Sequence, residues 1–347
     1  MSVTLSGKDK LEILGNITTM LHAGISLSEA VDSLLEDNKG ASRNALNMFR
    51  DELHEGRSLS VAMKKMPKSF DAVTINLIAA GEESGTLVET LEDVTKNIRK
   101  ELAFNDKIKA SLMYPAFVMG ILAAVMILIL TFVIPRISEV FLGLNVELPL
   151  ATRVLIQMSA FFTNNLIFVG LGTVLIVTLL ILLIKTKKHA MANMLLSLPG
   201  FKKLGREIDL ARFTRSMGLL LSSGITASEG LALAKASVLK KDISRAVDHM
   251  AKNVEAGKPM STDLRTLDKD VIPPVMIRLM QTAEQSGTLE TTFRELSTYF
   301  SNQVSRTLKT FIALLEPILL VVVGLLVGGI MLAIIAPIYG LISQINT

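Results

Sequence analysis

The amino-acid sequence predicts an all-α integral membrane protein with two tandem six-helix cytoplasmic bundle domains and three transmembrane helices. Three observations lead to this fold class: a pattern repeated after about two hundred residues, three long uncharged apolar stretches, and an uneven distribution of lysine and arginine. Half of the 347 residues are apolar, and the mean hydropathy of +0.48 exceeds that of an ordinary soluble protein.

The chain contains two copies of a unit of about a hundred residues, each followed by an apolar segment. The stretch GEESGTL at 81–87 returns as AEQSGTL at 283–289, and HAGISLSEAV around Gly24 returns as SSGITASEGL around Gly224. The offset grows from 200 at Gly24 to 202 at Pro115, a drift that small loop insertions produce. A period this long indicates an internal duplication.

Three stretches are long and apolar enough to cross a bilayer, which takes about 20 residues of helix. The first has 26 residues without a charge between Lys109 and Arg136, and the second has 31 between Arg153 and Lys185. The third runs from Pro317 to the C-terminus without any charge. Buried helices of a soluble protein are the alternative, but three uncharged runs of this length favour membrane spans.

The positive residues predict the orientation in the membrane. Lys and Arg number 14 in residues 1–110 and 20 in residues 185–310, against two in the loop at 135–165. Because positive residues stay in the cytoplasm, both large polar regions are expected there and the loop outside. The expected order is a first cytoplasmic helical repeat domain at 1–109, transmembrane helix 1 at 110–134, a short periplasmic loop at 135–165, transmembrane helix 2 at 166–184, a second cytoplasmic helical repeat domain at 185–310, transmembrane helix 3 at 311–342 and a periplasmic tail at 343–347.

The two polar regions differ in charge. Residues 1–110 carry 17 acidic and 14 basic side chains, whereas residues 185–310 carry 12 acidic and 20 basic ones. One interpretation is a solvated helical surface, and the other is a second domain that faces anionic headgroups or an acidic partner. Nucleic acid is not an expected partner, because the basic residues are scattered and aromatic stacking platforms are missing.

Each copy begins with a helix–glycine–helix corner. Residues 8–23 are amphipathic, Gly24 can supply a left-handed C-terminal cap, and Ser26 and Glu29 have the spacing of a capping box. The apolar stripe of the first helix consists of Leu11, Leu14, Ile17, Thr18 and Leu21. The second copy repeats the corner as Gly224, Thr226 and Glu229. Because the cap chemistry returns while the residues between it change, the corner is interpreted as structural.

The motif at 81–87 marks a second corner. A helical pattern at 71–83 ends at Gly85, after which Thr86 with Glu89 has the spacing to cap the next helix. The break returns at Gly287. The small Ser–Gly pair is also expected to let two helices approach closely.

Packing alone does not explain the repeated carboxylates Glu82 and Glu284. A solvated surface carboxylate, a buried polar tie and a contact with a partner are three open interpretations. The candidate partner contacts are Glu82, Ser84, Glu284 and Ser286.

The apolar segments contain residues typical of helix packing and kinks. Pro115 and Pro135 are separated by 20 residues, which is roughly 30 Å of helix. Gly324 and Gly328 form a GxxxG pattern. The position of Glu316, near the inner edge of the membrane, favours an interfacial or helix-pairing role for this residue over a proton relay. The residues expected to pack or kink the membrane helices are Pro115, Pro135, Glu316, Pro317, Gly324, Gly328 and Pro337.

No catalytic constellation stands out in the sequence. The chain has no Cys, which excludes thiol catalysis and Cys-based zinc sites, and its four His are dispersed. It has no GxxxxGK[ST] pattern, and the His54-Glu55 pair does not complete an HExxH motif. We therefore expect that the protein is not an enzyme and that it has no catalytic residue, no bound metal and no cofactor.

Taken together, these motifs resemble the type II secretion F family. The matching stretches are residues 24–30, 81–87, 114–115 and 134–135, followed by 224–230, 283–289 and 316–317. The resemblance covers nearly the whole chain, with Ala283 in place of an expected glycine. The short segment before the first repeat is similar to that of a type IVb pilus member or a compact competence-pilus version.

The resemblance implies a multi-pass platform protein in the bacterial cell inner membrane that serves a type IV pilus or a type II secretion system. It would couple a cytoplasmic hexameric assembly ATPase to insertion of pilin or pseudopilin subunits into a filament. Other inner-membrane assembly proteins, the lipid bilayer and a homo-oligomer are further expected partners. The alternatives are a multi-pass transporter component, which three spans with sparse polar residues disfavour, and a membrane receptor or adaptor, which only the family motifs disfavour.

Overall fold

The structure is a computed structural model that describes residues 3–143, 150–165, 201–264, 266 and 271–345. Within these ranges the chain forms helices and turns without a β-strand, which confirms the all-α class. The pattern of contacts divides the chain into unit 1, which comprises Met1–Lys107 and Asn193–Arg306, and unit 2, which comprises Ile108–Ala192 and Thr307–Thr347. Both polar repeats therefore belong to unit 1, and the apolar segments belong to unit 2.

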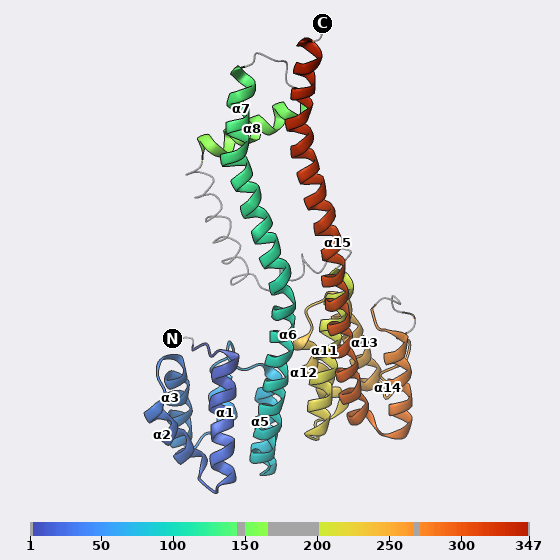
Figure 1. Cartoon of the computed structure of the whole chain (residues 1–347). Helices are drawn as coiled ribbons and strands as arrows, with labels where there is room; N and C mark the ends of the chain where they lie inside the picture. The colour runs from blue at the N-terminus through green and yellow to red at the C-terminus, as the bar shows by residue number, and fades with distance from the viewer. Residues whose placement is uncertain (1–2, 144–149, 166–200, 265, 267–270, 346–347) are drawn as a thin grey trace. The chain divides into compact units, whose positions relative to one another are not determined.

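The first repeat has six helices, which follow one another through short connections (Figure 1). They are α1 (Gly7–His22), α2 (Leu27–Asp37), α3 (Gly40–His54), α4 (Leu59–Lys64), α5 (Ala72–Ser84) and the first part of α6 (Leu87–Leu128). Each of α1 to α4 packs against the next helix along the chain. Short connections between antiparallel neighbours are typical of helix bundles.

The second repeat follows the same order with one difference. Its helices are α11 (Phe201–Ser222), α12 (Ala227–Ala234), the 3-10 helix η2 (Lys235–Ser237), α13 (Lys241–Glu255), α14 (Pro274–Ser286) and the first part of α15 (Leu289–Ile345). The expected six helices per copy are not confirmed here, because residues 260–264, which match α4, form turns. Asp263 has a φ of 57°, a left-handed conformation that a continuing α-helix does not allow.

The buried face of α1 differs in part from the predicted apolar stripe. Leu14, Ile17 and Thr18 are buried as predicted, but Ile13 is also buried, whereas Leu11 and Leu21 are only half-buried. The difference arises because α6 packs on α1 in addition to α2. Gly7 of α1 lies against Leu102 of α6, and Gly15 lies against Thr95.

Equivalent positions of the two copies fill their cores with different side chains. In the second copy the rings of Phe213 and Phe293 meet edge to face at 6.0 Å between α11 and α15. Their counterparts in the first copy are Ile13 and Leu91, and all four side chains are buried. Each such side chain contributes about 1.5–3 kcal/mol when it leaves water, so the Phe213–Phe293 pair helps to hold α11 to α15.

The predicted periplasmic loop at 135–165 is largely helical. After α6, the π-helical turn η1 (Ile129–Val133) leads into α7 (Ile134–Gly143), and α8 (Leu150–Asn164) follows. The helix therefore continues past Pro135 instead of ending there. A proline ring clashes with the carbonyl four residues before it, and a π turn is a common way to relieve such a clash.

The π turn leaves one carbonyl to be satisfied by a side chain. The Ile134 N–H donates to the Ile129 carbonyl, five residues back. In the same pattern the Leu130 carbonyl would accept from position 135, but proline has no N–H. The Ser159 hydroxyl of α8 donates to this carbonyl at 2.6 Å and is itself buried. Ser159 thus completes the hydrogen bonding around the proline.

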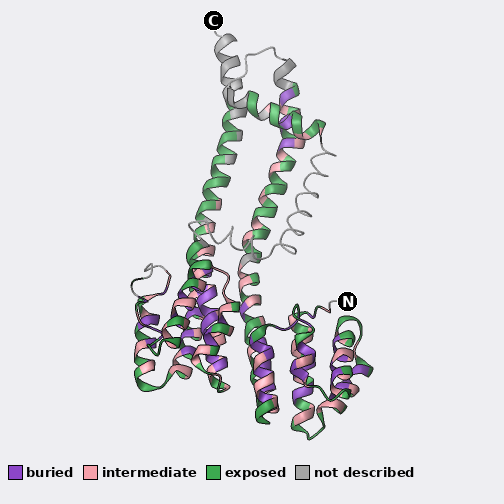
Figure 2. Cartoon of the chain, turned by 180° about the vertical axis from the view of Figure 1, so that it is seen from behind, coloured by how far each residue is buried: buried purple, intermediate pink, exposed green. Residues whose placement is uncertain are grey.

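Two described helices are long and apolar enough to cross a membrane. They lie within Leu87–Glu139 and Leu289–Gly329, with mean hydropathies of 3.0 and 2.6 in their most apolar windows, and few of the side chains in those windows are buried (Figure 2). An apolar helix that its own chain leaves uncovered suits a lipid environment. The expected boundaries at 109/110 and 310/311 fall inside α6 and α15.

Several predictions for the membrane segments concern residues for which little is described. Transmembrane helix 2, expected at 166–184, lies outside the described residues. Residues 343–345 of the expected tail are still part of α15. Pro115, Pro317 and Pro337 all lie inside helices, and a Cβ at Gly324 or Gly328 would meet no other part of the chain within 4 Å. A packing role for this GxxxG pattern stays a prediction.

Candidate functional sites at the repeat corners and in a basic groove

The first corner of the first repeat forms through local hydrogen bonds. After α1 ends, Gly24 adopts a φ of 84°. The Ser26 hydroxyl accepts from the Glu29 N–H at 3.3 Å, and the Glu29 carboxylate accepts from the Ser26 N–H at 3.2 Å, which is a complete capping box. Hydrogen bonds from the Ser26 hydroxyl and N–H lower the pKa of Glu29. The corner is thus a structural element that keeps its carboxylate ionised.

The same corner of the second repeat is similar but less complete. Gly224 has a φ of 78°, and the Thr226 hydroxyl accepts from the Glu229 N–H at 3.4 Å. Only this half of the box is formed among the described atoms. The corner therefore repeats its geometry with a weaker cap.

The second corner needs glycine for its backbone conformation. Gly85 and Gly287 both have a φ of 73° directly after α5 and α14, which is the αL position that commonly ends a helix. A Cβ at either residue would meet nothing within 4 Å, so the expected close approach of helices does not occur at these glycines. It occurs at Gly81, where a Cβ would lie 2.7 Å from the Cβ of Thr90.

The hydroxyl groups of this corner bond within the corner. The Ser84 hydroxyl donates to the Ala80 carbonyl at 2.7 Å and lies 2.7 Å from the Thr86 hydroxyl. In the second copy, Ser286 bonds the Thr282 carbonyl at 2.9 Å and the Thr288 hydroxyl at 2.7 Å. Ser84 and Ser286 are exposed, and their role as partner contacts stays a prediction.

The repeated carboxylates form what we call the carboxylate clamps. Glu82, in the last turn of α5, accepts from the Leu59 N–H at 2.5 Å and from the Ser60 N–H at 3.1 Å. These are the first two amides of α4, which have no partner inside their own helix. Glu82 therefore caps a helix that begins 23 residues earlier in the chain.

Glu284 forms the same clamp in the second repeat. Its carboxylate accepts from the N–H groups of Met260 and Ser261 and from the Ser261 hydroxyl. Residues 260 and 261 match residues 59 and 60 of the first copy, although they start a turn and not a helix. Of the three interpretations of these carboxylates, the hydrogen bonds fit the polar tie. A partner contact by Glu82 or Glu284 stays a prediction.

A second carboxylate ties α3 to α4 in the first repeat only. The buried Glu52 binds Arg57 through two hydrogen bonds of 2.5 and 3.1 Å, and it also pairs with Lys65. Hydrogen bonds from Arg57 and then Lys65 lower the pKa of Glu52 to about 2. Its counterpart in the second repeat, Asn253, makes a neutral bond to the Thr262 carbonyl at 2.9 Å.

Asp209 of α11 has a comparable structural role in the second repeat. This buried residue accepts from the N–H groups of Leu239 and Lys240 at 3.0 and 2.6 Å, just before α13 begins. Burial raises its pKa, while these two bonds and the charges of Arg212 and Lys240 oppose the rise. The sequence contains no local signal for this contact, because the partners are about 30 residues apart.

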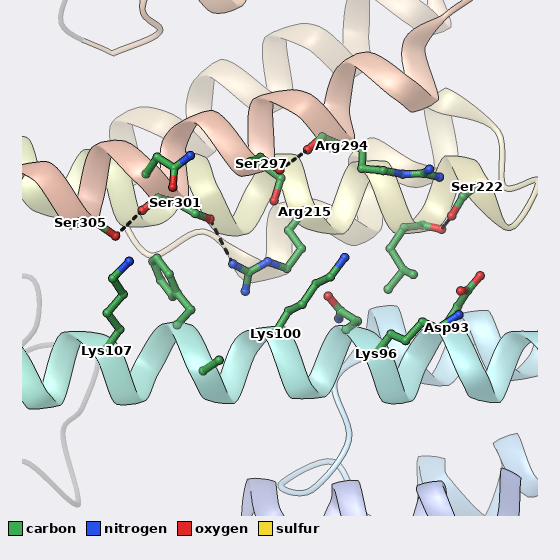
Figure 3. A pocket seen from close by; sticks show the side chains of 17 residues that line it. Asp93, Lys96, Lys100, Lys107, Arg215, Ser222, Arg294, Ser297, Ser301 and Ser305 are labelled. Atoms are coloured by element: carbon green, nitrogen blue, oxygen red, sulfur yellow. Dashed lines mark hydrogen bonds between the residues drawn. The ribbon is translucent and has the colours of Figure 1, made fainter. Parts of the chain in front are cut away.

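Unit 1 also contains a basic groove, a depression of about 570 Å³ between α6 of the first repeat and α11 and α15 of the second (Figure 3). Five cationic side chains and one carboxylate line it, together with several hydroxyl groups. The cations are Lys96, Lys100, Lys107, Arg215 and Arg294, and the carboxylate is Asp93. None of these residues stands out in the sequence, because the groove depends on how the copies pack.

Two of the five cations already have an acidic partner. Lys96 pairs with Glu92 at 2.7 Å, and Arg294 pairs with Glu290 at 2.5 Å. Lys100 and Lys107 are exposed and form no ion pair among the described residues. The groove therefore keeps an excess of positive charge.

Arg215 is held in place inside the groove. Its guanidinium group lies 5.1 Å from the Phe104 ring centre and donates to the Ser301 hydroxyl at 3.4 Å. Burial lowers its pKa, with Glu101 acting in the opposite direction and Arg212 in the same one. An arginine stays charged in proteins despite such a shift, so Arg215 is a fixed cation.

Comparisons with known proteins connect these features to a family. The sequence pattern of type II secretion system (T2SS) protein F matches residues 13–135 and 213–337. The type IV pilus assembly protein TapC of Aeromonas hydrophila is 29% identical over 94% of this chain and 79% of its own length.

Two further relatives carry pilus and secretion names. The type 4 fimbrial assembly protein PilC of Pseudomonas putida is 30% identical over 95% of this chain and 82% of its own length. The type II secretion system protein F of Pseudomonas aeruginosa is 27% identical over 97% of this chain and 84% of its own length. These names do not separate type IVb members, so that assignment stays a prediction. Because the family pattern covers both repeats and their apolar helices, this chain belongs to the type II secretion system protein F family.

Proposed function

We propose that this chain is the inner-membrane platform protein of a type IV pilus or type II secretion assembly machine. In this role it couples a cytoplasmic hexameric ATPase to the insertion of pilin-like subunits into a filament. The observation that supports the proposal most directly is the extent of the family match, which includes both repeats and the apolar part of α6 and α15. Relatives named for pilus assembly and for type II secretion agree with it.

The proposal includes a membrane topology. Three transmembrane helices would place both repeats in the cytoplasm and the residues around α7 and α8 in the periplasm. The excess of Lys and Arg in both repeats supports this orientation. It also puts both repeats on the side of the membrane where an ATPase can reach them.

Single-cysteine labelling tests the topology directly, because the natural chain has no Cys. Lys39→Cys in the first repeat and Lys252→Cys in the second should resist a membrane-impermeant maleimide in intact cells whose outer membrane has been permeabilised. Arg153→Cys in α8 should react. Labelling of either repeat from the periplasmic side would refute the orientation.

Deletion and complementation test the platform role. Cells without this chain should fail to display the filament or to secrete, while they retain normal levels of the pilin-like subunits. The wild-type chain should restore assembly, and it should co-purify with a hexameric ATPase and a pilin-like subunit after crosslinking. Normal filaments and normal secretion in the deletion strain would contradict the role.

The candidate partner contacts are tested by a double substitution. If Glu82 and Glu284 contact the ATPase, Glu82→Gln with Glu284→Gln should weaken ATPase binding more than it lowers the thermal stability of the chain. If the double variant keeps normal ATPase binding and filament assembly, Glu82 and Glu284 are not partner contacts, and only their clamp role is left.

A further inference from the structure

The basic groove offers positive charge that the chain itself does not neutralise. Lys100 and Lys107 stand on α6 with Phe104 between them, and Arg215 reaches from α11 into the same space (Figure 3). Seven residues of helix separate the two lysines, which is about 10.5 Å and two turns, so they share one face of α6. An occupant that carries negative charges at a similar spacing can contact both lysines.

The opposite wall of the groove carries neutral hydroxyl groups. Ser297, Ser301 and Ser305 lie at intervals of four residues along one face of α15. The Ser301 hydroxyl accepts from Arg215, and the Ser305 hydroxyl donates to the Ser301 carbonyl. Cations on one wall and hydroxyl groups on the other suit an occupant with several separated oxygen atoms and a polar surface.

The openness of the groove favours a segment of a larger molecule. Sites for small molecules enclose most of their ligand and are lined chiefly by apolar side chains. This groove is lined mainly by polar and charged side chains and follows α6 from Asp93 to Lys107, which is about 21 Å of helix.

We propose that the basic groove binds an acidic segment of a partner protein, with carboxylates about 10 Å apart set against Lys100 and Lys107. A helix with acidic residues seven positions apart has this spacing, since its rise matches that of α6. Arg215 is a third, preorganised contact, because Phe104 and Ser301 already fix its guanidinium group. That the partner belongs to an assembly machine rests on the proposed function.

Charge argues against occupation by the longest segment of the chain outside the described residues. Residues 166–200 carry Lys185, Lys187 and Lys188 and no acidic side chain. Such a segment would be repelled from the groove. The occupant is therefore expected to come from another protein.

The test uses the full-length chain in nanodiscs of zwitterionic lipid. The probe is a fluorescent alanine-rich helical peptide with glutamates seven residues apart, and a second peptide has lysines at the same places. The groove variant is Lys100→Glu with Lys107→Glu. The matched control is Lys39→Glu with Lys64→Glu, an equal charge change at exposed lysines of the same repeat outside the groove.

We expect the glutamate peptide to bind the wild type and the control alike and the groove variant about tenfold more weakly, because two surface ion pairs are replaced by repulsion. The lysine peptide should prefer the groove variant, a gain that a misfolded protein would not show. Binding of the glutamate peptide should weaken as salt is raised. Equal affinity for the groove variant and the control would overturn the proposal. So would lysine-dependent binding of sodium tripolyphosphate without binding of the peptide, which would assign the groove to a phosphate compound.

A test in cells separates the groove from the platform role. The groove variant should reach the membrane at normal levels but assemble fewer filaments or secrete less than the control. Loss of peptide binding with normal assembly would show that the machine does not use the groove, and the platform role would stand. A deletion strain with normal assembly would refute the platform role, while the peptide measurement would still decide what the groove binds.

Discussion

Replacing Glu82 by glutamine should open the first turn of α4. The carboxylate accepts two backbone N–H groups at 2.5 and 3.1 Å, whereas a glutamine keeps one acceptor and turns an NH₂ group toward the other amide. Loss of a helix cap costs about 0.5–2 kcal/mol, and a hydrogen bond to a charged group contributes about 1.5–3 kcal/mol. Since Glu82 is half-buried and one acceptor remains, we expect a loss of about 1–2 kcal/mol.

Hydrogen exchange of the Leu59 and Ser60 amides measures this loss locally. A decrease of about 1–2 kcal/mol in the free energy of opening corresponds to exchange about 5–30 times faster. Glu83→Gln is the matched control, because it makes the same chemical change at an exposed neighbour with no described hydrogen bond. Equal exchange of the two amides in Glu82→Gln and Glu83→Gln would refute the clamp.

Three further predictions concern other contacts of the structure. Gly85→Ala should destabilise the chain by about 1–2 kcal/mol, because its φ of 73° is strained for alanine. The control is Gly120→Ala within α6, where an added Cβ would meet nothing within 4 Å, and it should not lower the melting temperature. Lowering the pH from 4.5 towards 2 should remove stability that the Glu52 ion pairs contribute, because the folded pKa of about 2 lies below the ordinary value of 4.5. That stability is fully present above pH 4.5, and in Glu52→Gln the corresponding decrease in melting temperature should be absent. Ser159→Ala should cost about 1–3 kcal/mol by leaving the Leu130 carbonyl without a donor, and a melting temperature equal to that of the wild type would contradict the role of Ser159 at the π turn.

The sequence predicted those features that depend on neighbouring residues. The capping box at Ser26 and Glu29 and the helix breaks at Gly24 and Gly85 follow from local backbone chemistry, and the structure contains them. Comparison of the copies could not show that the fourth helix is lost in the second one. That change depends on the left-handed conformation of Asp263, which its side chain permits but does not require.

Long-range contacts were beyond the sequence pattern. The repeat made Glu82 noticeable, but nothing local indicated that its carboxylate reaches the amide of Leu59. Likewise, Pro135 suggested a kink or an end of the helix, whereas the outcome depended on Ser159, which approaches from α8. A hydrogen bond between distant residues requires the packed structure, because many other donors in the sequence have the same chemistry.

The basic groove shows how a duplicated fold can acquire a site that neither copy has alone. Arg215 stands at the position of Gly15 in the first copy, and the counterpart of Lys100 in α15 is Asn302. The clamps, in contrast, use the same residue type in both copies and hold the same pair of segments together. The clamp positions, which agree between the copies, therefore hold segments of each bundle together, whereas the groove positions Lys100 and Arg215, which differ from their counterparts, create charged surface where the copies meet. On this argument, Arg215→Gln should weaken binding of the glutamate peptide without changing amide exchange at Leu59, and Glu82→Gln should do the reverse. Substitutions that affected both measurements equally would show that the groove and the clamps form one coupled element.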